Sequence, residues 1–137
     1  MTLVLDASLT LASILRDEST EAAQAIMRRV VREGAHVPSL WRLEVANVLR
    51  NTVRRGRCDA LFVDSALRDL EAMSITIDTE TDVQAWSATL ALSRAEDLTL
   101  YDAAYLELAV RLGATLASCD RQLVAAARRR GLDVLTT

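Results

Sequence analysis

Carboxylates are the groups in this chain best suited to chemistry, because the other common catalytic side chains are scarce. The 137 residues include one histidine, His36, and two cysteines, Cys58 and Cys119, and all 16 basic residues are arginine. The cysteines have no Cys-x-x-Cys spacing, which argues against a structural zinc site and favours two free thiols. The absence of lysine excludes mechanisms that depend on one.

Two of the acids follow segments that we predict to be strands. Asp6 comes after the apolar run 3–5, and Asp120 comes after the run 115–118. In open parallel sheets, ligands bind just beyond the carboxyl ends of the strands. The two carboxylates would therefore share one crevice if their strands are neighbours. The simpler interpretation is that both are loop caps, and Asp120 is well placed to begin the last helix.

Two further acids stand among apolar residues, where burying a carboxylate is costly unless it is paired or binds a metal. Glu44 lies in the apolar segment 40–49, and Asp102 lies in the first turn of the segment 100–109. Each again has a simpler interpretation. Glu44 could occupy an exposed helix face, and Asp102 could complete a capping box with Thr99.

The segments that must position these acids alternate between strand and helix. We predict strands at 3–5, 35–38, 74–77, 114–118 and 134–135, and helices at 9–16, 21–33, 40–55, 60–73, 80–95, 100–112 and 120–130. Ser8 is predicted to cap the first helix, Ser19 or Thr20 the second and Asp59 the fourth, and Thr79 with Asp82 to form a capping box. The alternation predicts an α/β fold, a three-layer sandwich with a central parallel sheet of four or five short strands. The length indicates a single domain over residues 1–137.

Composition indicates where in the cell the protein is expected and whether a partner covers part of its surface. No run of about 20 apolar residues is present, so we expect no membrane-spanning helix. The first residues lack the basic region of a signal peptide, and we expect a cytoplasmic protein. The net charge is −3 and 51% of the residues are hydrophobic, which is high for a small soluble chain. Some apolar surface is therefore expected to be covered by a partner.

Four segments together resemble the PIN domain, and their order, spacing and total length fit the VapC-type toxins. The segments are 4–8, 43–49, 98–109 and 116–123, of which the third, LTLYDAAYLELA, is the most distinctive. The resemblance assigns the acidic quartet of that family to Asp6, Glu44, Asp102 and Asp120, and the hydroxyls that accompany it to Ser8 and Ser118.

The resemblance implies hydrolysis of RNA phosphodiester bonds with one or two divalent ions. Clustered carboxylates repel one another, which raises some of their pKa values, and a divalent cation relieves this. Hard oxygen ligands suit Mg²⁺ or Mn²⁺, which can supply a nucleophilic water and stabilise charge on the phosphate. Ser8 and Ser118 would hold waters or phosphate oxygens. RNA contacts are predicted at Arg54, Arg55 and Arg57, whose simpler interpretation is a solvated helix end.

The same resemblance implies a cognate antitoxin and either a homodimer or a toxin–antitoxin hetero-oligomer. The segments 9–15 and 60–70 carry more apolar residues than one helical stripe needs. A groove between two such helices could accept an amphipathic helix of the antitoxin, which would send a basic side chain toward the acids. Alternatively, these residues complete an ordinary core.

Two other functions stay open on the sequence alone. One is a PIN nuclease of RNA processing without an antitoxin, and the other is a non-catalytic PIN-like module that binds RNA or protein. All four acidic positions are filled, which favours the enzyme. A haloacid-dehalogenase-like phosphatase needs a second aspartate where Ser8 stands, and a lysine as well. A phosphate-binding P-loop is also missing.

Overall fold

The structure is a computed structural model and describes residues 2–137. Five strands form one sheet in the order β3-β2-β1-β4-β5, and every neighbouring pair is parallel. The strands are β1 (Leu3–Leu5), β2 (Ala35–Val37), β3 (Ile75–Ile77), β4 (Thr115–Ala117) and β5 (Val134–Leu135). The predicted sheet of short parallel strands is confirmed.

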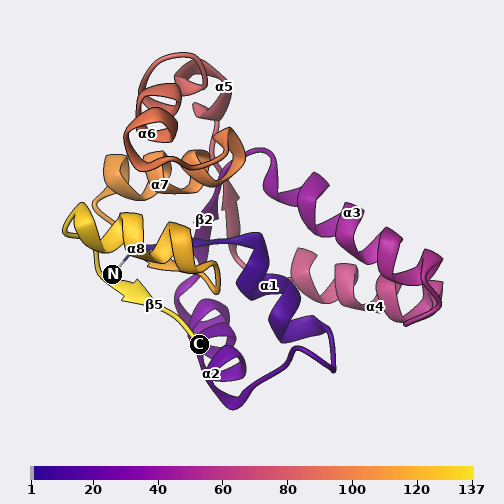
Figure 1. The fold of residues 1–137 in the computed structure, drawn as a ribbon. Coiled ribbons are helices and arrows are strands. Elements are labelled where there is room, and N and C mark those ends of the chain that lie inside the picture. The colour runs from indigo at the N-terminus through magenta and orange to yellow at the C-terminus, as the bar shows by residue number, and fades with distance from the viewer. Residues whose placement is uncertain (1) are drawn as a thin grey trace.

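Helices cover both faces of this sheet, as the right-handed rule for parallel crossovers requires. The chain runs one way across the sheet from β1 through β2 to β3, and the opposite way from β4 to β5. The first four helices therefore lie on one face and the last four on the other, as Figure 1 shows. They are α1 (Ala7–Ile14), α2 (Glu21–Glu33), α3 (Trp41–Arg54), α4 (Ala60–Glu71), α5 (Thr81–Gln84), α6 (Ala88–Glu96), α7 (Leu100–Leu112) and α8 (Arg121–Arg129).

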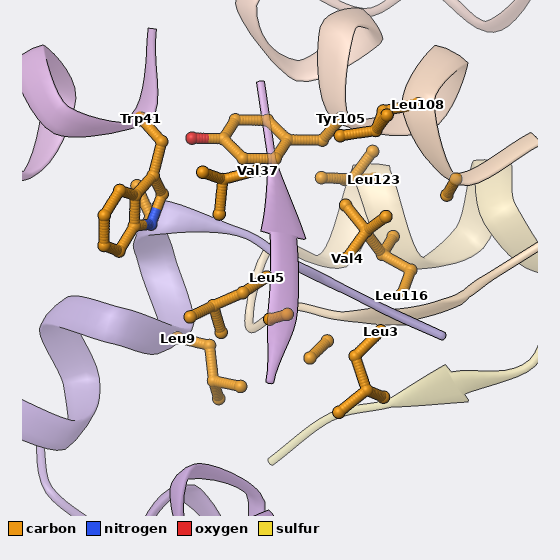
Figure 2. Packing of buried hydrophobic residues seen from close by; sticks show 14 of the residues in the cluster. Leu3, Val4, Leu5, Leu9, Val37, Trp41, Tyr105, Leu108, Leu116 and Leu123 are labelled. Carbon is orange, nitrogen blue, oxygen red and sulfur yellow. The ribbon is translucent and has the colours of Figure 1, made fainter. Parts of the chain in front are cut away.

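The core is centred on β1, the middle strand of the sheet. Leu3, Val4 and Leu5 are at most 1% exposed, as expected of a strand that is covered by helices on both faces. Figure 2 shows these residues packed among side chains of the other elements, including Leu116 from β4 and Tyr105 from α7. Both acids that follow the central strands are thus attached to the most deeply buried part of the molecule.

The first helix begins earlier than predicted. Helix α1 starts at Ala7, and Asp6 occupies the cap position with extended backbone angles (φ −77°, ψ 145°). The prediction that Ser8 caps this helix is wrong, because the Ser8 hydroxyl donates to the Asp6 carboxylate instead. Strand and helix therefore meet without a loop, and Asp6 stands at the junction.

The segment predicted as one helix over 80–95 is broken into α5 and α6. The predicted capping box of Thr79 and Asp82 is wrong, since α5 begins at Thr81 and has no side-chain cap. Arg111 of α7 fixes the preceding turn through ion pairs with Asp78 (2.8 Å) and Glu80 (3.1 Å). These contacts come from a helix distant in sequence, so local capping signals could not anticipate them.

Other local predictions agree with the structure. Thr20, Asp59 and Thr99 cap α2, α4 and α7 through their side chains. Cys58 and Cys119 are free thiols. None of the helices described within residues 2–137 has the length and apolarity needed to traverse a bilayer.

Candidate active site

The candidate site lies where the strand order reverses, between β1 and β4. Leu5 of β1 pairs with Ala117 of β4, so Asp6 and Ser118 each stand one residue beyond the end of the ladder. The Asp6 amide still donates to the Ala117 carbonyl (2.9 Å). A crevice at such a switch point is the usual ligand site of an open parallel sheet.

Two serine hydroxyls hold the Asp6 carboxylate. Ser8 Oγ and Ser118 Oγ both donate to Asp6 Oδ2, at 2.6 and 2.7 Å. The serines are themselves fixed by backbone amides, because Cys119 donates to Ser8 Oγ and Asp120 donates to Ser118 Oγ, each at 3.0 Å. Asp6 is 4% exposed, and these two donors offset part of the cost of burying it. The predicted role of the serines toward water or phosphate stays a prediction.

Glu44 reaches the same region from the first turn of α3. Its Oε1 atom accepts a 2.6 Å hydrogen bond from the hydroxyl of Tyr105, a fully buried residue of α7. Sequence reasoning missed Tyr105. The available signal was its spacing, since a residue three positions after Asp102 lies on the same helix face.

Asp102 lies in the first turn of α7, three residues after the residue that caps this helix. Its backbone amide donates to the Thr99 hydroxyl (3.1 Å), so Thr99 caps α7. Its carboxylate is half-buried and close enough to Asp6 and Asp120 to be repelled by both. The first turn of α7 therefore presents an acid to the site.

Asp120 follows β4 and begins α8. Its Oδ1 atom accepts from the Leu123 amide (3.0 Å), which confirms its interpretation as a helix cap. Its charge also acts on two of the other acids, Asp6 and Asp102. One carboxylate thus serves the helix and contributes to the negative potential of the site.

Burial and mutual repulsion raise the pKa of three of these acids. Burial raises the pKa of Asp6 most, and Asp120 adds repulsion, while the two serine hydrogen bonds oppose both. Burial, followed by repulsion from Asp120 and Asp6, raises the pKa of Asp102 from 3.8 to about 6. The pKa of Glu44 is raised by burial and by the charges of Asp6 and Asp102. Each of the four predicted acids therefore lies within electrostatic reach of at least two of the others.

The donor set suits a hard divalent cation. Its oxygens are carboxylates, the ligands that Mg²⁺ and Mn²⁺ prefer, and their repulsion is what a cation would relieve. Within residues 2–137, however, no three acidic, histidine or cysteine side chains are close enough to enclose an ion. Asp6, Glu44 and Asp120 each direct one carboxylate oxygen to a donor of the protein itself.

The predicted RNA-contacting arginines lie away from the acids. Arg54 is in the last turn of α3, about 15 Å along the helix axis from Glu44 at ~1.5 Å per residue. Arg54, Arg55 and Arg57 are all exposed, and Arg57 pairs with Asp17 at 2.8 Å. Their contact with RNA stays a prediction.

Comparisons with known proteins place the chain in a family. A family model described as the PIN domain matches residues 3–136. Ribonuclease VapC3 of Mycobacterium tuberculosis is 31% identical over 123 residues, which is 90% of this chain and 85% of that protein. Ribonuclease VapC3 of Pyrobaculum aerophilum is also 31% identical, over 90% of this chain and 92% of that protein.

Solved structures with lower identity share the fold. PAE2754 from Pyrobaculum aerophilum has a TM-score of 0.72 at 23% identity, covering 98% of this chain and 90% of that chain. VapBC2 from Rickettsia felis, solved with a DNA fragment from its promoter, has a TM-score of 0.64 at 13% identity, covering 100% and 99%. The chain therefore belongs to the PIN-domain family and, within it, to the group of VapC ribonucleases.

Proposed function

We propose that this protein is a Mg²⁺- or Mn²⁺-dependent endoribonuclease and the toxin of a toxin–antitoxin pair. One observation carries the catalytic part. Three acids from three separate elements have raised pKa values, and repulsion within the cluster contributes to each rise. A cluster of negative charge like this destabilises the fold. Such clusters are typical of functional sites, where the carboxylates bind a cation. The ribonuclease names of the relatives support RNA as the substrate.

The side chains have separable tasks in this proposal. The ion would be held by Asp6, Glu44, Asp102 and Asp120, and when bound it supplies an activated water and stabilises charge on the phosphate. Ser8 and Ser118 orient the Asp6 carboxylate through two short hydrogen bonds. Asp102 must lose its proton to bind a cation, so its pKa of about 6 favours activity at neutral pH and above.

A groove at the C-terminal end of α1 fits the proposed antitoxin. It has a volume of about 390 Å³ and is formed by α1, α2 and α4. Apolar side chains from all three helices line it, namely Ile14, Met27, Val31, Phe62, Ala66 and Leu70. The two segments predicted to carry excess apolar residues therefore meet here, with α2 added, although Leu9 and Leu11 of the same set belong to the core. Such a groove suits an amphipathic helix.

The test of catalysis uses the purified protein and a mixed RNA substrate. Asp6→Asn and Asp102→Asn are expected to abolish cleavage in Mg²⁺ or Mn²⁺ while the protein stays folded, and Asp64→Asn, an exposed acid of α4, serves as the matched control. If Asp6→Asn cleaves at the wild-type rate with contaminating nuclease excluded, the catalytic assignment is wrong.

The test of the toxin role is genetic and hydrodynamic. The chain is expressed alone and together with the small open reading frame beside its gene. We expect growth arrest that co-expression relieves, and a larger solution mass when both products are present. A harmless monomer that ignores the neighbouring product would refute the antitoxin and oligomer proposals and leave the nuclease proposal standing.

A further inference from the structure

We propose that Tyr105 is a positioning residue that holds the Glu44 carboxylate in the acidic cluster and thereby strengthens cation binding. This inference rests on the proposed metal-dependent function. It concerns a residue with no carboxylate and no exposed surface, whose side-chain hydrogen bond in the site goes to Glu44.

The hydrogen bond between Tyr105 and Glu44 joins two helices that lie on opposite faces of the sheet. Glu44 belongs to α3 on one face, and Tyr105 belongs to α7 on the other. Figure 2 shows the Tyr105 hydroxyl pointing toward the start of α3, where Trp41 lies. The backbone N–H of Ala7, the residue after Asp6, also lies near this hydroxyl and partly opposes the rise in its pKa. The Tyr105 hydroxyl thus bonds to Glu44 and lies near the backbone next to Asp6. It also belongs to the helix that carries Asp102.

Glu44 depends on this contact for its orientation. A glutamate has three side-chain torsions, and fixing them costs rotamer entropy that a partner must offset. Among residues 2–137, the Tyr105 hydroxyl is the one hydrogen-bond donor found for the Glu44 side chain. Tyr105 is 0% exposed and packed in the core, so the hydroxyl itself is rigidly placed. The rigidly placed Tyr105 hydroxyl therefore selects the rotamer of Glu44.

The chemistry of the partner suits a cation ligand. A neutral hydroxyl orients Glu44 without cancelling its negative charge, whereas an arginine in its place would compete with the metal. The nearby Arg42 points elsewhere and approaches Glu71 at 3.9 Å. The bond occupies Oε1 and leaves Oε2 of Glu44 available. Burial raises the pKa of Tyr105 most, and the bond to Glu44 raises it further, so the phenol stays protonated and remains a donor.

The test measures Mn²⁺ binding directly, by electron paramagnetic resonance of free Mn²⁺ at pH 7.5 without RNA. Tyr105→Phe keeps the ring and removes the hydroxyl, and we expect about tenfold weaker Mn²⁺ binding, in the range typical of lost outer-shell contacts. Trp41→Phe is the matched control, because it removes another buried hydrogen bond that anchors α3, to the Thr10 hydroxyl (3.2 Å), without touching an acidic side chain. It should lower the melting temperature and leave Mn²⁺ affinity unchanged.

A double-mutant cycle separates positioning from general destabilisation. In a Glu44→Gln background, adding Tyr105→Phe should change Mn²⁺ affinity less than twofold, because the two residues act as one unit. An undiminished loss in that background, or wild-type affinity in Tyr105→Phe alone, overturns the inference while the proposed function survives. A wild-type protein that binds no Mn²⁺ overturns the proposed function, and this inference with it.

Discussion

Removing the charge of Asp102 should make the metal-free protein more stable at neutral pH. In the folded state the pKa of this carboxyl is about 6 instead of 3.8, mainly because of burial and then because of repulsion by Asp120 and Asp6. The ionised form is therefore unfavourable in the folded protein. Asp102→Asn removes that charge and leaves the backbone hydrogen bond to Thr99 in place.

The size of the gain follows from this pKa. One unit of pKa is worth about 1.4 kcal/mol, so the rise corresponds to about 3 kcal/mol at most. Asp102 is partly exposed, and solvent screening reduces this to about 1–2 kcal/mol. A carboxylate in the first turn of a helix also stabilises it by about 0.5 kcal/mol, which the substitution forfeits. The expected net gain is about 1 kcal/mol, or about 3–4 °C in melting temperature for a domain of this size.

The stability gained by Asp102→Asn should depend on pH. Below pH 3.8 the carboxyl is protonated in both the folded and unfolded states, so Asp102→Asn should gain nothing there. The gain should grow between pH 4 and 6 and be complete above about pH 7, because a raised folded-state pKa makes stability fall as pH rises. Thermal unfolding in EDTA at pH 4 and 7.5 measures it, with Asp64→Asn as control. A destabilised Asp102→Asn at pH 7.5, or an equal gain at both pH values, would refute the electrostatic reasoning.

Three further outcomes are expected. Arg111→Met should cost about 2–3 kcal/mol at pH 7, because it leaves the nearly buried Asp78 carboxylate without its cation. Burial alone would raise the pKa of Asp78, but the Arg111 hydrogen bonds outweigh it and lower that pKa, so urea unfolding should show the cost shrinking below about pH 3.8. Gly34→Ala should destabilise by about 1 kcal/mol more than Gly56→Ala, since both have positive φ but only at Gly34 would a Cβ meet a carbonyl, at 2.8 Å. Val31→Asp, at an exposed position in the α2 part of the groove, should weaken co-purification with the antitoxin and leave RNA cleavage by the free protein unchanged.

Much of the fold could be predicted because its signals are local. The run Leu3–Leu5 is wholly apolar and ends in an acid, and parallel-sheet topology then fixes where that acid must lie. The caps at Thr20, Asp59 and Thr99 follow from hydroxyl or carboxylate side chains placed just before apolar helical repeats.

The parts that could not be predicted depend on contacts between distant segments. The bond between Glu44 and Tyr105 joins residues from two helices on opposite faces of the sheet, and no local pattern encodes it. Likewise, Ser8 looks like a helix cap in sequence, yet the hydroxyl turns to Asp6 because a buried carboxylate needs donors more than the helix end does.

The register of β1 against β4 limits how this protein can vary. Asp6 and Ser118 meet because Leu3, Val4 and Leu5 pair one to one with Thr115, Leu116 and Ala117. One residue inserted or deleted in either strand would slide the acid by about 3.3 Å and turn it to the other face of the sheet. Strands of three residues are too short to accommodate such a shift in register. Among homologous chains, changes in length should therefore gather in the connections on the helical layers, while the count of residues from strand to acid stays constant.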